Sequence, residues 1–214
     1  MRFSLEFPEL YRRTNILGEE NVLKCQVKYG VKKHVLASSS SVYAGCPMPF
    51  TEDAILGTMQ SPYAETKRHA ELLAWEYHER FDLDVTVLRK FTVFGAAGRP
   101  YMAPSRFIKW IDGGSPITLY RDGSASLDFT YVDDIASSTI LAGKLREYEG
   151  VRKQGDGMIA GHAPNTGLAA EGVDAGGNPE GASGYNFINL GGGRNPLSYP
   201  VVIGMSEKAL GKKA

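Results

Sequence analysis

The sequence lacks the features that mark several specialised classes of protein. Its two cysteines, Cys25 and Cys46, are too few for a disulfide framework, so we expect small buried or loop residues. Lys and Arg equal Asp and Glu at 24 each, and this balance gives no indication of a nucleic-acid or anionic-membrane surface. No apolar run approaches the roughly 20 residues that cross a bilayer, and the N-terminus does not resemble a signal peptide. We therefore expect a globular protein of the cytoplasm.

Metal-site spacing is missing as well. The four histidines, His34, His69, His78 and His162, form no Cys, His or Asp pattern of the kind that binds a metal ion. We expect them to be solvated or core residues. The sequence therefore predicts no metal site.

The first half of the chain alternates helical and strand patterns. A helix is predicted from Pro8 to Gly30, a buried strand over residues 33–37, a helix over about 61–81 and a strand over 85–88. The inward stripe of the second helix is expected to contain Ala70, Leu73, Tyr77 and Phe81. This order favours βαβ units and a parallel sheet.

The second half has more glycine and proline. The predicted elements are a short helix over 106–111, strands over 117–120, 128–132 and 185–190, a helix starting near Asp133 and a last helix over about 198–210. Glycine recurs over about 150–184, which predicts a mobile insertion or long loop. We expect two domains, residues 1–95 with the parallel sheet and a smaller α/β lobe over 96–214.

A candidate proton-transfer site lies where the first strand ends. A row of hydroxyls, Ser38 to Ser41, follows that strand, and Tyr63 and Lys67 open the next helix four residues apart, on one face. An ammonium beside a phenol favours the phenolate, because opposite charges attract. Ligands of parallel α/β sheets bind outside the carboxyl ends of the strands, so Phe91 to Gly95 should join the same crevice.

Structural roles are the alternative for each of these residues. Tyr63 and Lys67 could be an ordinary tyrosine and an exposed lysine at a helix start. The serine hydroxyls could satisfy backbone groups at the strand end. Arg89 is expected to make a structural ion pair.

Six motifs in order carry a family resemblance. They are SSSSVY at 38–43, YAETK at 63–67, LRKFTVFG at 88–95, GRPYMA at 98–103, DFTYVDDI at 128–135 and NLGGGR at 189–194. Together they resemble the extended short-chain dehydrogenase/reductases of the NAD-dependent epimerase/dehydratase family, most closely the UDP-glucuronate and UDP-glucose 4-epimerase branch. The resemblance implies part of a doubly wound, Rossmann-like sheet, with a substrate lobe after it.

The resemblance also implies a reaction. NAD would accept hydride from C4 of a UDP-sugar, while Tyr63 takes the proton of the 4-hydroxyl, giving a 4-keto intermediate that is reduced on its other face. Lys67 would hold the nicotinamide ribose, and Ser39 would bond the sugar oxygen. The implied catalytic residues are therefore Ser39, Tyr63 and Lys67.

The remaining roles follow from position in the motifs. The implied cofactor-binding residues are Asn15, Ala37, Ser38, Tyr63, Lys67, Phe91 and Val93. The implied substrate-binding residues are Ser39, Ser40, Ser41, Thr92 and Arg99, of which Arg99 would meet an anionic group. Dehydratases of the family often carry an acidic pair where this chain has Ser40 and Ser41, which favours epimerisation over dehydration or decarboxylation. A homodimer is implied by resemblance alone.

One part of the family pattern is missing from these 214 residues. A glycine-rich turn normally binds the dinucleotide phosphates, but only a helix and a strand precede Ser38. Neither Gly155–Ala160 nor Gly191–Gly193 has both the preceding strand and the spacing. Leu127 also replaces an arginine that holds the nucleotide diphosphate. Two hypotheses stay open: a truncated epimerase, or a non-catalytic remnant or interaction module.

Overall fold

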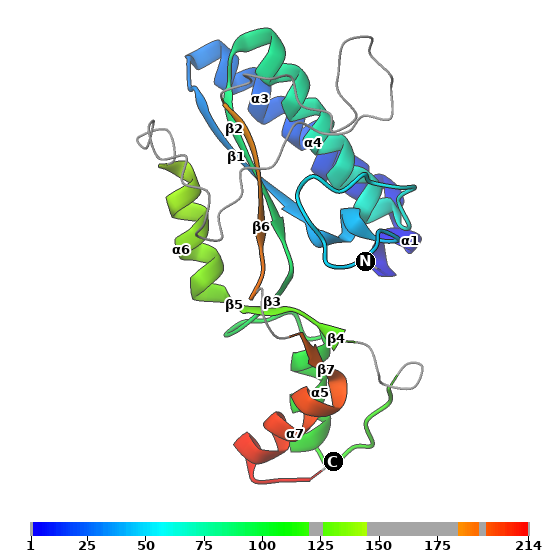
Figure 1. Ribbon diagram of the computed structural model, residues 1–214. Coiled ribbons are helices and arrows are strands. Elements are labelled where there is room, and N and C mark those ends of the chain that lie inside the picture. Colours follow the sequence, from blue (N-terminus) through cyan, green and yellow to red (C-terminus); the bar gives the residue numbers. More distant parts are fainter. Residues whose placement is uncertain (1, 120–125, 145–183, 193–195, 214) are drawn as a thin grey trace. The chain divides into compact units, whose positions relative to one another are not determined.

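The computed structural model describes residues 2–119, 126–144, 184–192 and 196–213 (Figure 1). The chain forms two units: Met1–Lys90 with Ser137–Leu190, and Phe91–Ala136 with Gly191–Ala214. The insertion predicted at about 150–184 lies outside the described residues, except for Gly184.

A three-stranded parallel sheet forms the centre of the first unit. Its order is β1 (Lys33–Ser39), β2 (Asp84–Lys90) and β6 (Tyr185–Leu190). Lys33 aligns with Asp84 and Ser39 with Lys90, so β1 and β2 end at the same edge. The predicted α/β class with a parallel sheet is confirmed.

The opening helical region is less regular than predicted. A short helix, α1 (Arg2–Glu6), precedes α2 (Pro8–Arg12), and a π-helical turn, η1 (Arg13–Leu17), joins α2 to α3 (Gly18–Tyr29). Gly30 ends α3 with φ of 70°, the left-handed conformation that glycine adopts readily. The predicted stop is therefore confirmed, whereas α1 and the π-helical turn were not predicted.

Helix α4 (Pro62–Phe81) covers one face of this sheet together with α3 (Figure 1). The Ser61 side chain accepts the Ala64 N–H at 3.2 Å and caps the helix start. The buried face contains Ala70, Ala74 and His78, spaced by four.

The predicted stripe of α4 was wrong at its end. Phe81 is 41% exposed, because the stripe from Ala70 continues through Ala74 to His78 and leaves Phe81 off that line. His78 lies on this buried line, and its ring is satisfied there because Nδ1 lies 2.6 Å from the Leu83 carbonyl oxygen.

The other face of the sheet carries a smaller apolar cluster. Leu88 and Ile188 pack there with Ala142, which lies near the end of α6 (Val132–Gly143). Helix α6 begins one residue before its predicted start. The sheet is thus covered on both faces, as parallel sheets usually are.

The described part of the second unit contains two short strand pairs, two helices and the first turn of α6. Strand β3 (Thr92–Phe94) pairs with β5 (Phe129–Tyr131) in parallel, and β4 (Ser126–Leu127) pairs with β7 (Leu197–Ser198) antiparallel. Its helices are α5 (Ala103–Asp112) and α7 (Tyr199–Leu210), both close to their predictions.

The strand predicted at 117–120 is wrong over its described part. Residues 117–119 form no strand, and Tyr120 lies outside the described residues. The β-branched Ile117 and Thr118 favour strand structure, but no described strand pairs with this segment.

The two units divide the chain differently from the predicted domains, 1–95 and 96–214. The second unit begins at Phe91, and Ser137–Leu190 returns to the first unit. The reason is β6, which pairs with β2 over six residues and so brings a late part of the chain into the first sheet.

Candidate functional site

The serine row follows β1 as predicted. Ser39 ends the strand and caps the 3-10 turn η2 (Ser40–Tyr43), because its Oγ accepts the Ser41 N–H at 3.2 Å. The Ser39 hydroxyl also donates to Ser41 Oγ at 3.1 Å. Ser38 and Ser39 are buried, whereas Ser40 and Ser41 are half-buried. The turn therefore holds the Ser39 oxygen at the end of the strand.

Lys67 connects α4 directly to this strand end. Its Nζ donates to the Ala37 carbonyl oxygen at 2.8 Å, two residues before Ser39. Burial lowers the pKa of Lys67; the nearby Lys90 ammonium acts in the same direction, and the Glu19 and Glu71 carboxylates oppose it. Lys67 and Ala37, which were each predicted to bind the cofactor, are thus in contact with one another.

Tyr63 occupies the first turn of α4. Its ring is half-buried and meets the Tyr11 ring edge-on, with centroids 5.9 Å apart. Its N–H donates to Ser4 Oγ at 3.2 Å. Residues of α1 and α2 therefore support the helix start that carries the predicted base, whose catalytic role stays a prediction.

Asn15 lies in the π-helical turn and is bonded to α4. Its Nδ2 donates to Thr66 Oγ1 at 2.9 Å, and that hydroxyl donates to the Tyr63 carbonyl oxygen at 2.9 Å. Single π-helical turns are frequent at functional sites. The side chain therefore supports the Tyr63–Lys67 turn, and its predicted contact with the cofactor stays a prediction.

Sequence reasoning missed a buried carboxylate, Glu71, on α4. Arg89 binds it through Nε at 3.0 Å and Nη2 at 2.9 Å, Arg68 binds it through Nη1 at 3.1 Å, and Ser38 Oγ donates to it at 2.5 Å. Burial opposes the charge of Arg89, but Glu71 and Tyr43 outweigh it and raise the pKa of Arg89. The predicted structural ion pair of Arg89 is confirmed, and Ser38 turns its hydroxyl to Glu71.

A second missed group fixes the loop after η2. The Tyr43 hydroxyl accepts from Arg89 Nη1 at 2.8 Å and donates to Asn189 Oδ1 at 2.9 Å. Glu52 Oε1 accepts the Asn189 N–H at 2.7 Å. Burial raises the pKa of Tyr43, which keeps its hydroxyl a neutral donor. The loop is thereby bonded to the ends of β2 and β6.

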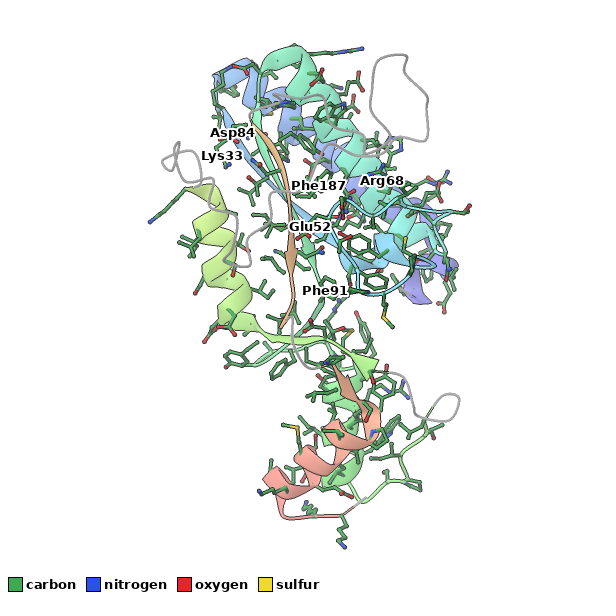
Figure 2. All side chains as sticks on the ribbon, in the orientation of Figure 1. Lys33, Glu52, Arg68, Asp84, Phe91 and Phe187 are labelled. Atoms are coloured by element: carbon green, nitrogen blue, oxygen red, sulfur yellow. The ribbon has the colours of Figure 1, made fainter. Side chains whose placement is uncertain are left out.

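Figure 2 shows both ends of the first sheet. Phe187 lies on β6 within the sheet and Arg68 lies on α4, whereas Lys33 and Asp84 lie together where β1 and β2 begin. The Arg89 guanidinium carbon is 4.2 Å from the centroid of the Phe187 ring. Lys33 and Asp84 form a separate ion pair of 3.1 Å. The buried charges of the site region therefore gather beyond the middle of the strands, toward their carboxyl ends.

Four predicted site residues, Phe91, Thr92, Val93 and Arg99, belong to the second unit. The Thr92 N–H donates to the Asp128 carbonyl oxygen at 3.2 Å, and Val93 aligns with Thr130 between β3 and β5. Arg99 is exposed in the loop before α5. Their convergence with the residues of the first unit stays a prediction.

The described residues contain neither a metal-binding cluster nor a membrane-spanning helix. They contain no group of three or more His, Cys, Asp or Glu side chains that could hold a metal ion. No helix in the described part of the chain has the length and apolar character that crossing a membrane requires.

Comparisons with known proteins agree with the motifs. The family described as "NAD dependent epimerase/dehydratase family" matches residues 1–152. A UDP-glucuronate 4-epimerase of Thermodesulfobacterium geofontis is 43% identical over the whole chain, which covers 55% of that protein. A probable UDP-glucuronate 4-epimerase of Rhizobium meliloti is 32% identical, again over the whole chain and 58% of that protein.

A solved structure is similar in fold and sequence. The UDP-glucuronic acid 4-epimerase of Bacillus cereus, in complex with UDP-glucuronic acid and NAD, superposes with a TM-score of 0.71 and 30% identity. The match covers 95% of this chain and 53% of that one. The chain therefore spans about half the length of the curated relatives it matches.

Proposed function

The chain belongs to the NAD dependent epimerase/dehydratase family, and from that membership we propose that it supplies the proton-transfer residues of an NAD-dependent UDP-sugar 4-epimerase. UDP-glucuronate is the first substrate to test, because two relatives are named for it and a similar structure binds it. The observation that carries the proposal is the 2.8 Å contact of Lys67 with Ala37, which joins the Tyr63 helix to the serine row.

The residues present fit the reactive end of NAD better than its phosphates. Bound NAD would supply the hydride acceptor for C4 of the sugar. Lys67 already lies against the strand end beside exposed Ala37, so these two, with Ser38, Tyr63 and Asn15, would hold the nicotinamide side. We propose Phe91 and Val93 as further contacts. No glycine-rich turn for the pyrophosphate occurs in the 214 residues.

The chain's own residues would move the proton. Tyr63 would take it from the sugar 4-hydroxyl and return it after the 4-keto sugar has turned over. The Ser39 hydroxyl would bond the same sugar oxygen. Ser40 and Ser41 offer hydroxyls rather than carboxylates, which supports epimerisation over water elimination. Thr92 and Arg99 are proposed as sugar contacts.

The test measures interconversion of UDP-glucuronate and its 4-epimer with NAD present. The chain is assayed alone and fused behind the glycine-rich half of the 43%-identical relative. We expect the fused protein to interconvert the sugars, and Tyr63→Phe to lower kcat by about 100-fold or more, because general acid–base catalysis contributes that much. An unchanged kcat in Tyr63→Phe would contradict the proposed role.

A non-catalytic module is the second candidate. It is favoured by β1, which has a partner strand on one side only among the described strands, and such edges bind further strands. Calorimetry of the 214-residue chain with NAD tests this second candidate. The module predicts weak or no binding, and tight binding would contradict it.

We also propose that the chain forms a homodimer through its opening helices. Phe3, Leu5, Phe7, Leu10 and Leu17 are each about half exposed or more, an apolar surface that association would cover. Sedimentation of the chain and of Leu5→Asp would test this. A monomer at all concentrations would refute the dimer.

A further inference from the structure

The Glu71 side chain is 0% exposed and is nevertheless a carboxylate. Burying a charge is unfavourable unless hydrogen bonds and opposite charges compensate for it. Glu71 has such partners from three places: Ser38 on β1, Arg89 on β2 and Arg68 on α4 itself. An apolar side chain would fill the same space without the desolvation. The presence of a charge at Glu71 is therefore better explained by the geometry that it imposes on its partners than by a gain in the stability of the fold.

Glu71 continues the stripe that carries the predicted catalytic residues. Tyr63, Lys67 and Glu71 follow one another at intervals of four along α4, so they share one face of the helix. Lys67 holds the carbonyl of Ala37, and Glu71 holds the hydroxyl of Ser38. Two successive residues of β1 are thus bound by two side chains one helical turn apart.

The direction of the Glu71 carboxylate is fixed by Arg89. Nε and Nη2 of Arg89 bind the two carboxylate oxygens, which is the bidentate geometry that leaves little freedom of rotation. Arg89 aligns with Ser38 in the register of β1 and β2, so strand pairing brings both to the same carboxylate. The oxygen that receives the Ser38 hydroxyl therefore has a set position.

We infer that Glu71 is a positioning residue: it locks the end of β1 to α4, so that Ser39 keeps a fixed place relative to the Tyr63–Lys67 turn. The catalytic meaning of this inference rests on the proposed function. The positioning itself is a property of the chain alone and can be measured without turnover.

The Ser41 amide reports the position of Ser39, because it donates to the Ser39 hydroxyl oxygen. Its hydrogen exchange is measured by NMR in the full chain and in two matched variants. Ser38→Ala removes the hydroxyl that ties β1 to the Glu71 carboxylate. Tyr185→Phe also removes a buried hydroxyl bonded to Glu71, but one that donates to the backbone carbonyl oxygen, at 2.8 Å.

We expect exchange at Ser41 to become about tenfold faster in Ser38→Ala, the effect of losing one net hydrogen bond. Exchange at Val35 and Leu36, near the middle of β1, should not change. Tyr185→Phe should leave Ser41 as it is. Unchanged exchange in Ser38→Ala, equal acceleration in Tyr185→Phe, or equal acceleration at every amide of the first unit would overturn the inference.

Glu71→Gln extends the test to the carboxylate. It keeps the shape of the side chain and should accelerate Ser41 at least as much as Ser38→Ala. If it does not fold, Ser38→Ala alone decides the question. In the fused enzyme the kinetic readout uses Glu71→Gln, because Ser38 is itself a proposed cofactor contact, and this variant should lower kcat while KM for the UDP-sugar stays unchanged. Absence of turnover in the unsubstituted protein would contradict the proposed function and leave the exchange result valid.

Discussion

The two units of the chain are stabilised in different ways. The first unit buries a charged network, in which Glu71 and Arg89 have side chains 0% and 2% exposed. The second unit holds its helices together by apolar contacts: Phe107 of α5 meets Tyr199 of α7 edge-on, with ring centroids 5.6 Å apart. Its ion pair between Asp112 and Lys212 is on the surface. Geometry at the first unit's strand ends is thus set by directional bonds, which an apolar core does not supply.

The second unit also has an apolar cavity. Its volume is about 280 Å³. It is lined by side chains of α5, α7 and the neighbouring strands, including Phe94, Ile108, Phe129, Val202 and Met205. Such a lining offers almost no partner to a sugar hydroxyl, whereas the serine row offers several. The two units therefore differ in the chemistry of the surfaces that they offer: hydroxyls at the strand ends of the first and an apolar lining in the second.

Removing Arg89 should have the largest effect on stability. Arg89→Met leaves Glu71 buried with a single arginine partner, and breaking a buried pair in this way costs about 3–5 kcal/mol. Chemical denaturation monitored by amide exchange in β2 measures the loss. Asp112→Asn is the control, since it removes an exposed ion pair of the second unit and should leave β2 unchanged. A small loss of stability in Arg89→Met would contradict the claim that the two units are stabilised in different ways.

A smaller effect is expected from the core of the second unit. Ile111 is 1% exposed, and Ile111→Val should lower the stability of α5 by about 0.5–1.5 kcal/mol, because it leaves a gap of one methylene. Amide exchange in α5 measures the loss of stability in the second unit, and amide exchange in β2 shows whether the first unit is affected. Ile108→Val makes the same change on the same helix at a side chain that is 47% exposed, and should have little effect. Equal losses in both variants would mean that α5 has no distinct buried face.

The sequence predicted repeating patterns well and single contacts poorly. The parallel order of β1 and β2 and the limits of β6 follow from apolar runs and turn residues, which are local signals. Glu71 was missed because it sits among Ala70, Leu72 and Leu73 on a helix whose charged residues mostly face solvent. Its partners Ser38 and Arg89 are 33 and 18 residues away along the chain. No local pattern encodes such a meeting.

The same limit explains the errors in the second half. The strand predicted at 117–120 had the right residue types, but strand formation depends on a partner. The return of β6 to the first sheet likewise depends on its pairing with β2. The sequence shows how many residues separate the two strands, but it does not show that they will pair. Tertiary pairing, rather than propensity, decided both.

The smallest expected effect concerns the charge of Lys67. Its pKa is lowered, first by burial, and Lys90 adds to the shift. Between the lowered folded pKa and the unfolded value of 10.5, the unfolded chain binds more protons than the folded chain, so stability should rise with pH in that window.

NMR titration of the Lys67 side chain should give a midpoint below 10.5, and Lys90→Met should raise that midpoint because a like charge is removed. Exposed Lys24, whose pKa is raised by its bond to Glu20, is the internal control and should not respond. A Lys67 midpoint that is unmoved by Lys90→Met would show that the two ammonium groups do not interact, and burial alone would then account for the shift.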